Sequence, residues 1–132
     1  MASAAYWLAS ACKGIACTPS ADVGSIGVYM AALDESAAWA KEGYKLVLVK
    51  AGERKAEGIS GSAISEATIA AWQAEVDEIY ALFTADILLS RPGVESTAMQ
   101  GQCFMGRSAV FNNLVDAIVP DLSTLAQQIA QG

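Results

Sequence analysis

Asp22-Val23-Gly24-Ser25-Ile26-Gly27-Val28 places three strand-forming residues and two glycines around one serine. Valine and isoleucine favour strands, whereas a glycine inside a strand often marks a place where another part of the backbone comes close. We therefore predict a strand from this segment to about Met30, in which Gly24 and Gly27 flank Ser25 at a close backbone approach. A strand of this kind is common and says little about function by itself.

The neighbouring segments predict an alternation of strands and helices. Residues 1–11 are rich in alanine and predict a short buried helix whose first turn holds Ser3, and residues 14–17 predict a brief strand. Residues 34–36 open a helix, because acidic side chains favour helix N-termini, and residues 45–49 form the clearest predicted strand of the chain. This order predicts an α/β fold with a small, mainly parallel sheet.

One long helix dominates the second half of the chain. Ser65 is its predicted cap, and it runs to about Ser90, where Pro92-Gly93 ends it. Its apolar residues recur at three- and four-residue spacing and form one face, which we expect in a core or a subunit interface; they are Ile69, Trp72, Val76, Ile79, Tyr80, Phe83 and Ile87. A strand near residues 102–105, a helix over 107–112 and a last helix to Gln131 follow.

Composition excludes several classes of function. A net charge of −6 argues against a nucleic-acid partner, because binding to phosphates requires a basic surface. The longest uncharged run, residues 1–12, is too short to span a bilayer and lacks the basic residues of a signal peptide. The three cysteines are odd in number and follow no ligand spacing, so we expect reduced, mostly buried thiols in a cytosol-like compartment.

The chain contains no histidine. This excludes serine–histidine and cysteine–histidine nucleophile systems and argues against a zinc or redox-metal site, because imidazole is the commonest ligand; we predict neither a metal nor a cofactor. An activated nucleophile would need a lysine, a carboxylate or an N-terminal amine as its base. Lys55 lies in a polar loop after the predicted strand at residues 45–49, where α/β folds often place chemistry. The plainer interpretations are a helix residue for Ser3, a backbone-bonded hydroxyl for Ser25 and a solvated charge for Lys55.

Four segments carry a resemblance that covers nearly the whole chain. They are Ala2-Ser3-Ala4-Ala5-Tyr6-Trp7-Leu8-Ala9-Ser10, Thr18-Pro19-Ser20-Ala21-Asp22 with the following Val23 to Val28, the Ala51-Gly52 loop with Lys55, and Leu114-Val115-Asp116. In this order they resemble the signal peptide peptidase A (protease IV) family of serine–lysine peptidases, especially its short phage head-maturation members. The resemblance implies a Clp-protease/crotonase-like α/β fold and a peptide or protein substrate.

The resemblance also implies roles for single residues. Ser3 matches the nucleophile, Lys55 the general base, and Ser25 the serine whose hydroxyl orients the lysine amine. The backbone amide of Ala4 matches one oxyanion-hole donor. The chemistry is coherent, because a serine hydroxyl needs a neighbour to take its proton and a lysine can do so only when it is neutral.

Two departures from the family pattern affect these expectations. Family members carry several βα units before the nucleophile, including a glycine pair that supplies the other oxyanion donor, whereas Ser3 is the third residue here. We therefore expect residues 1–132 to form a single partial peptidase domain that begins at the nucleophile segment, with the fold incomplete. Whether this fragment is active or inactive stays open at this point. Asn113 stands where the family commonly has glycine, and asparagine tolerates the left-handed conformation that such a turn needs.

Two functions remain open at this point. The first is a serine endopeptidase of the signal-peptide peptidase type or the phage or prophage capsid-maturation type. The alternative is a catalytically silent, oligomerising assembly module derived from a prophage protease. In both cases we expect a homo-oligomer in the bacterial cytoplasm or a phage procapsid, with membrane association only if a missing N-terminal region carries an anchor.

Overall fold

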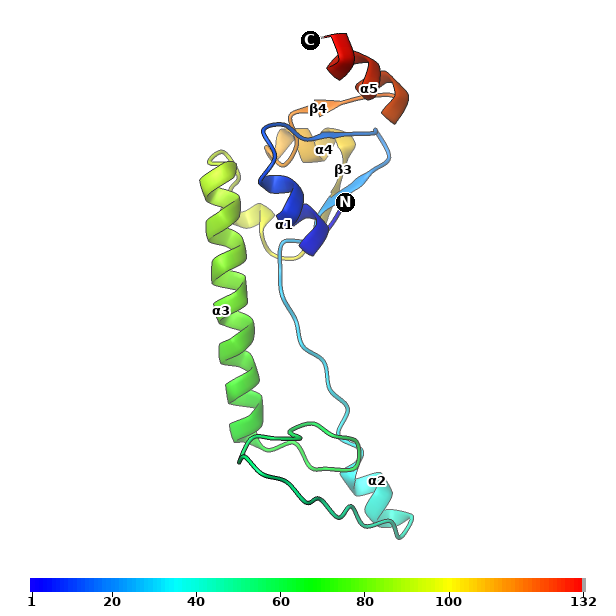
Figure 1. Ribbon diagram of the computed structural model, residues 1–132, viewed down its shortest axis with the longest axis vertical. Helices are drawn as coiled ribbons and strands as arrows, with labels where there is room; N and C mark the ends of the chain where they lie inside the picture. Colours follow the sequence, from blue (N-terminus) through cyan, green and yellow to red (C-terminus); the bar gives the residue numbers. More distant parts are fainter. Residues whose placement is uncertain (132) are drawn as a thin grey trace. The chain divides into compact units, whose positions relative to one another are not determined.

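The structure, a computed structural model, describes residues 1–131 and divides into two compact units. The first unit combines Met1–Val28 with the chain from Ile79 onward, and the second is Tyr29–Glu78. In chain order the elements are α1 (Ala4–Ser10), β1 (Ala16–Cys17), β2 (Asp22–Gly24), α2 (Ser36–Lys41), α3 (Glu66–Ser90), the 3₁₀ helix η1 (Ser96–Ala98), β3 (Cys103–Met105), α4 (Gly106–Phe111), β4 (Ala117–Ile118) and α5 (Leu122–Gln131) (Figure 1).

The strands of the first unit form two small ladders. β1 pairs in parallel with β4, and β2 pairs antiparallel with β3, with Val23 opposite Phe104. A parallel bridge between Ala2 and Gly24 adds the first residues of the chain beside β2. The combination of helices with small sheets is in keeping with an α/β domain, although the predicted parallel pairing is found in only one of the two ladders.

The core of the first unit gathers residues from α1, β2 and the end of α3. Its most completely buried side chains include Tyr6, Val23, Phe83, Ile87 and Leu114. The predicted apolar face of α3 therefore belongs to the core at Phe83 and Ile87. Nearer the start of the same face, Ile69 and Ile79 are 47% and 37% exposed.

Local signals at the helix ends are confirmed. The Thr68 amide donates to the Ser65 hydroxyl at 3.1 Å, so Ser65 caps α3 as predicted. α1, α2, α4 and α5 all lie within the segments predicted to be helical, give or take a residue. None of the helices in the described part of the chain combines the length and apolar character needed to cross a bilayer.

The predicted strand at residues 45–49 is wrong. This segment lies in the second unit without regular structure, and its Val47 and Val49 are 77% and 94% exposed. Strand-forming side chains indicate only a preference, whereas a strand also needs a neighbouring segment to supply its backbone hydrogen bonds. Within the residues that the structure describes, no segment pairs with residues 45–49.

The second unit is held together around α2 and the loops that follow. The Asp34 carboxylate accepts hydrogen bonds from the amides of Ser36 and Ile64, each at 2.9 Å, so it joins the start of α2 to the start of α3. These bonds, the one from Ile64 above all, lower the pKa of Asp34. Trp39 and Tyr44 meet edge to face, with ring centroids 6.1 Å apart. The loop that carries Lys55 belongs to this unit.

All three thiols are free, as predicted, but their burial differs from the prediction. Cys17, in β1, is buried, whereas Cys12 and Cys103 are exposed. The expectation of mostly buried thiols is therefore wrong. Cys12 lies in the turn after α1, and Cys103 opens β3, a strand at which alternate side chains face solvent.

Candidate active site

Ser3 stands immediately before α1 in a backbone conformation that residues with side chains rarely adopt. Its φ and ψ are 54° and −133°. Its amide donates to the Gly24 carbonyl at 2.8 Å, and its side chain is exposed. Because a non-glycine residue at positive φ is strained, such residues persist where the surrounding structure enforces them, often at functional sites.

Ser25 lies next to Gly24, whose carbonyl accepts the hydrogen bond from Ser3, and it also has a positive φ. It follows Gly24 directly, its φ is 51°, and its amide donates to the Gln102 carbonyl at 2.8 Å. Its side chain is partly buried. The hydrogen bond from Ser3 to Gly24 therefore brings the backbones of the two predicted serines together, each in a strained conformation.

The glycines around Ser25 are needed because other backbone comes close. A Cβ atom on Gly24, whose φ is 116°, would lie 2.9 Å from the Gln102 carbonyl oxygen. A Cβ atom on Gly27 would lie 3.2 Å from the Cα atom of Gly101. The close backbone approach predicted from the sequence is thereby confirmed at both glycines.

Ala4 is the first residue of α1 and is exposed. The amides of Tyr6 and Trp7 both donate to the Ser3 carbonyl, at 2.8 and 3.0 Å, but the Ala4 amide has no partner within the described residues. A free amide directly after a serine, at the positive end of a helix, can donate to negative charge that develops on an oxygen beside that serine.

Lys55 belongs to the second unit, whereas Ser3 and Ser25 belong to the first. Its side chain is exposed, its amide donates to the Gly52 carbonyl at 3.2 Å, and the next residue, Ala56, has a φ of 70°. Nearby, Arg54 and Glu57 form an exposed ion pair at 3.1 Å. The structure thus brings the two serines together, and the contact between Lys55 and Ser25 stays a prediction.

Comparison with known families decides the class of the chain. The family model described as peptidase family S49 matches residues 1–131. The chain belongs to peptidase family S49. This confirms the resemblance to the signal peptide peptidase A (protease IV) family, and membership implies serine peptidase activity. No curated protein sequence matches the chain.

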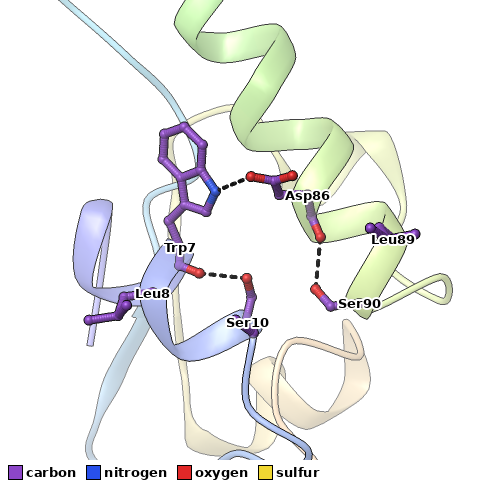
Figure 2. Close-up of a pocket in the computed structure, with 7 residues that line it drawn as sticks. Trp7, Leu8, Ser10, Asp86, Leu89 and Ser90 are labelled. Atoms are coloured by element: carbon purple, nitrogen blue, oxygen red, sulfur yellow. Dashed lines mark hydrogen bonds between the residues drawn. The ribbon is translucent and has the colours of Figure 1, made fainter.

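The helix that begins after the nucleophile candidate of this S49 chain is held on two sides. Tyr6 is fully buried, and its hydroxyl donates to the Leu114 carbonyl at 2.7 Å. Trp7 donates its indole N–H to the Asp86 carboxylate at 2.8 Å (Figure 2). It also stacks on Phe83, with ring centroids 4.5 Å apart. A cavity of about 400 Å³ lies between the end of α1 and the end of α3, beside these contacts.

An ion pair supports the segment that includes Leu114. The Arg91 guanidinium donates to both oxygens of the Asp116 carboxylate, at 2.6 and 2.9 Å, and the Ile15 amide donates to the same group at 2.7 Å. The hydrogen bonds from Arg91, and then the one from Ile15, hold the pKa of Asp116 below its usual range. One carboxylate thereby joins the end of α3 to the start of β1 in the S49 chain.

Asn113 occupies the turn between α4 and this segment. Its φ is 60°, so the expectation that asparagine would tolerate a left-handed conformation here is confirmed. Its side-chain amide also donates to the Gly93 carbonyl at 2.7 Å, a contact that the usual glycine could not make.

The sequence did not indicate some of the residues around the candidate site. Gln102, whose carbonyl accepts from Ser25, and Arg91 carried no local signal, because their partners are distant in the chain. Tyr6 could have been found, since it lies one helical turn after Ser3. In the part of the chain that the structure describes, no three His, Cys, Asp or Glu side chains lie close enough together to hold a metal ion.

Proposed function

We propose that this S49 chain is a serine endopeptidase with Ser3 as nucleophile and Lys55 as general base. One observation carries the proposal. Four non-glycine residues in the described chain have a positive φ; two are Ser3 and Ser25, and a third, Ala56, directly follows Lys55. Each such residue costs about 1–3 kcal/mol, so their occurrence at Ser3 and Ser25, and directly beside Lys55, supports a function there.

In the proposed reaction the Ser3 hydroxyl oxygen attacks the carbonyl carbon of the scissile peptide bond. The neutral Lys55 amine takes the hydroxyl proton, and the Ser25 hydroxyl holds that amine in place. The Ala4 amide donates to the oxygen that becomes negative in the tetrahedral intermediate. The protonated lysine then gives its proton to the leaving amine, and water hydrolyses the acyl-enzyme by the same steps.

A lysine can act as a base near neutral pH only if its charged form is disfavoured, either by removal of water or by a nearby positive charge. Lys55 is exposed. The proposal therefore includes a surface that covers the Lys55 amine in the active form, and we propose that a bound peptide or a second copy of the chain supplies it. Self-association is part of the proposal, as one of these two ways to cover the Lys55 amine.

The type of peptidase is proposed from the sequence resemblance. The similarity of residues 2–10 and 18–28 to the signal peptide peptidase A family supports a Clp-protease/crotonase-like fold and peptide or protein substrates. It favours a signal-peptide peptidase or a phage or prophage capsid-maturation protease. For the second of these, the bacterial cytoplasm or a phage procapsid is the proposed location.

A fluorophosphonate reagent, which phosphonylates activated serines with loss of fluoride, tests the proposal. We expect labelling of the wild type, its complete loss in Ser3→Ala, and a loss of at least about 100-fold in Lys55→Met, as expected for removal of a general base. Ser108→Ala and Lys50→Met are matched controls, because both residues are exposed and neither is assigned a role. Labelling that survives Ser3→Ala, or a wild type that forms oligomers and never labels, would contradict the proposal.

A further inference from the structure

We propose that Tyr6 is a positioning residue for Ser3, which it holds through a buried hydrogen bond to the Leu114 carbonyl. The inference rests on the proposed role of Ser3 as nucleophile. Tyr6 does not reach the reacting atoms; it fixes the first turn of α1, and that turn fixes Ser3.

Two hydrogen bonds make Tyr6 the link between Ser3 and the interior. Its amide donates to the Ser3 carbonyl at 2.8 Å, and its hydroxyl donates to the Leu114 carbonyl at 2.7 Å. Its side chain has no exposed surface, so no water replaces the second bond if it breaks. A residue one turn from Ser3 is thereby tied to a residue 108 positions away in the sequence.

The acceptor lies on a well-supported part of the first unit. Leu114 is itself fully buried, and its amide donates to the Ala109 carbonyl at 2.9 Å. On one side of it, Asn113 donates to the Gly93 carbonyl; on the other, Asp116 is held by Arg91 and by the Ile15 amide. The Leu114 carbonyl is therefore a fixed point against which α1 can be placed.

Ser3 needs such a fixed point because its conformation is strained. On its N-terminal side, the bond from its own amide to the Gly24 carbonyl holds it. On its C-terminal side, the restraint comes through α1, and of the two side chains that anchor α1 only Tyr6 makes a buried bond; the bond from Trp7 to Asp86 is solvent-exposed. A nucleophile displaced by about 1 Å can lose on the order of 100-fold in rate.

The first test compares two tyrosines that make the same kind of bond. Tyr6→Phe keeps the ring and removes the hydroxyl. Tyr80→Phe is the matched control, because the Tyr80 hydroxyl donates to the carbonyl of the buried Met99 at 2.6 Å but is carried by α3. We expect both variants to fold, and only Tyr6→Phe to lower the second-order rate of Ser3 labelling, by roughly 10- to 100-fold. Equal labelling rates in the two variants would overturn the inference.

The second test does not depend on activity. Hydrogen exchange of the Ser3 amide reports its bond to Gly24, and exchange of the Ser25 amide, bonded to the Gln102 carbonyl, serves as an internal reference. In Tyr6→Phe we expect exchange at Ser3 to rise by about 10-fold or more relative to Ser25, and we expect no such change in Tyr80→Phe. A parallel rise at both amides would mean general loosening and would overturn the inference.

The two tests separate the two proposals. If no variant labels, yet exchange rises selectively at Ser3 in Tyr6→Phe, Tyr6 positions Ser3 and the endopeptidase proposal is wrong. If the wild type labels and Tyr6→Phe labels equally fast, the peptidase proposal stands and the role of Tyr6 is wrong.

Discussion

Asn113 combines a strained backbone with a compensating side-chain contact. Its φ of 60° disfavours residues other than glycine and asparagine, and its side chain donates to the Gly93 carbonyl. We expect Asn113→Ala to lower the free energy of unfolding by about 2 kcal/mol, because alanine is less tolerated than asparagine at this φ and the side-chain bond is lost. Asn113→Gly, which loses the bond but relieves the strain, should cost less. Urea denaturation measures both, and an alanine variant as stable as the glycine variant would contradict this account.

Tyr6 makes the free energy of unfolding depend on pH in the alkaline range. Burial, opposed by the nearby Arg91 and reinforced by Asp116, raises the pKa of Tyr6 to about 12. An unfolded tyrosine titrates near pH 10, so its contribution is complete below about pH 10 and is lost as pH rises towards 12. Over this pH range we expect the free energy of unfolding of the wild type to fall by on the order of 2 kcal/mol more than that of Tyr6→Phe.

Unfolding measured in urea from pH 9 to 12 checks this difference. Tyr29→Phe is the control, because Tyr29 is 89% exposed. That variant should keep the alkaline loss of the wild type. An identical pH dependence in Tyr6→Phe and the wild type would show that Tyr6 is not buried as described.

Among the contacts between elements, the ion pair Arg91–Asp116 joins α3 to β1. We expect this pair to make the free energy of unfolding depend on pH in the acid range. The pKa of Asp116 lies below that of an unfolded aspartate, about 3.9, so the pair stabilises the fold above that pH and is lost as pH falls through the lower, folded value. We expect Asp116→Asn to cost about 1–2 kcal/mol at neutral pH and to remove part of the acid dependence. This is less than for a fully buried pair, because the Asp116 side chain is 52% exposed.

Urea denaturation between pH 2 and 7 measures this contribution. Glu95→Gln is the control, since Glu95 is exposed in the same unit and forms no ion pair within the described residues. If Asp116→Asn follows the same pH curve as the wild type, the ion pair does not hold α3 to β1.

The elements that the sequence predicted well are those with local causes. Ser65 marks the start of α3, and the residues after Ser3 form a helix, because caps and helical spacing act within a few residues. Residues 45–49 have equally good strand residues and form no strand, because pairing depends on a distant segment. For the same reason no strand is predicted at β4: its partner is β1, about a hundred residues earlier.

The candidate site likewise has some features that the sequence predicts and others that it does not. Ser3, Ser25, Ala4 and Lys55 came from matching short segments to a family, and the close approach at Gly24 came from its glycine. The contact between Ser3 and Gly24 could not be predicted, because it depends on how the first residues lie beside β2. The bond from Tyr6 to Leu114 joins opposite ends of the chain, and nothing local predicts it.

For the whole molecule we expect self-association. Residues 45–49 offer strand-forming side chains and a backbone that pairs with no other described segment, and Val47 and Val49 are largely exposed. Sedimentation velocity at micromolar concentration should show species larger than the 13.7 kDa monomer, and replacing both valines with serine should shift the distribution towards monomer. Leu122→Ser is the control, because Leu122 in α5 is 75% exposed. A wild type that sediments only as a monomer would contradict the expectation.

The buried thiol of Cys17 can report the rate at which the first unit opens. The side chain is 7% exposed within β1, and burial raises the pKa of its thiol, so the reactive thiolate is scarce while β1 stays paired with β4. With Cys12 and Cys103, both exposed, replaced by serine, alkylation of the remaining thiol by iodoacetamide can proceed only as fast as this ladder opens. When alkylation is faster than reclosing, the alkylation half-life would then measure how often β1 separates from β4.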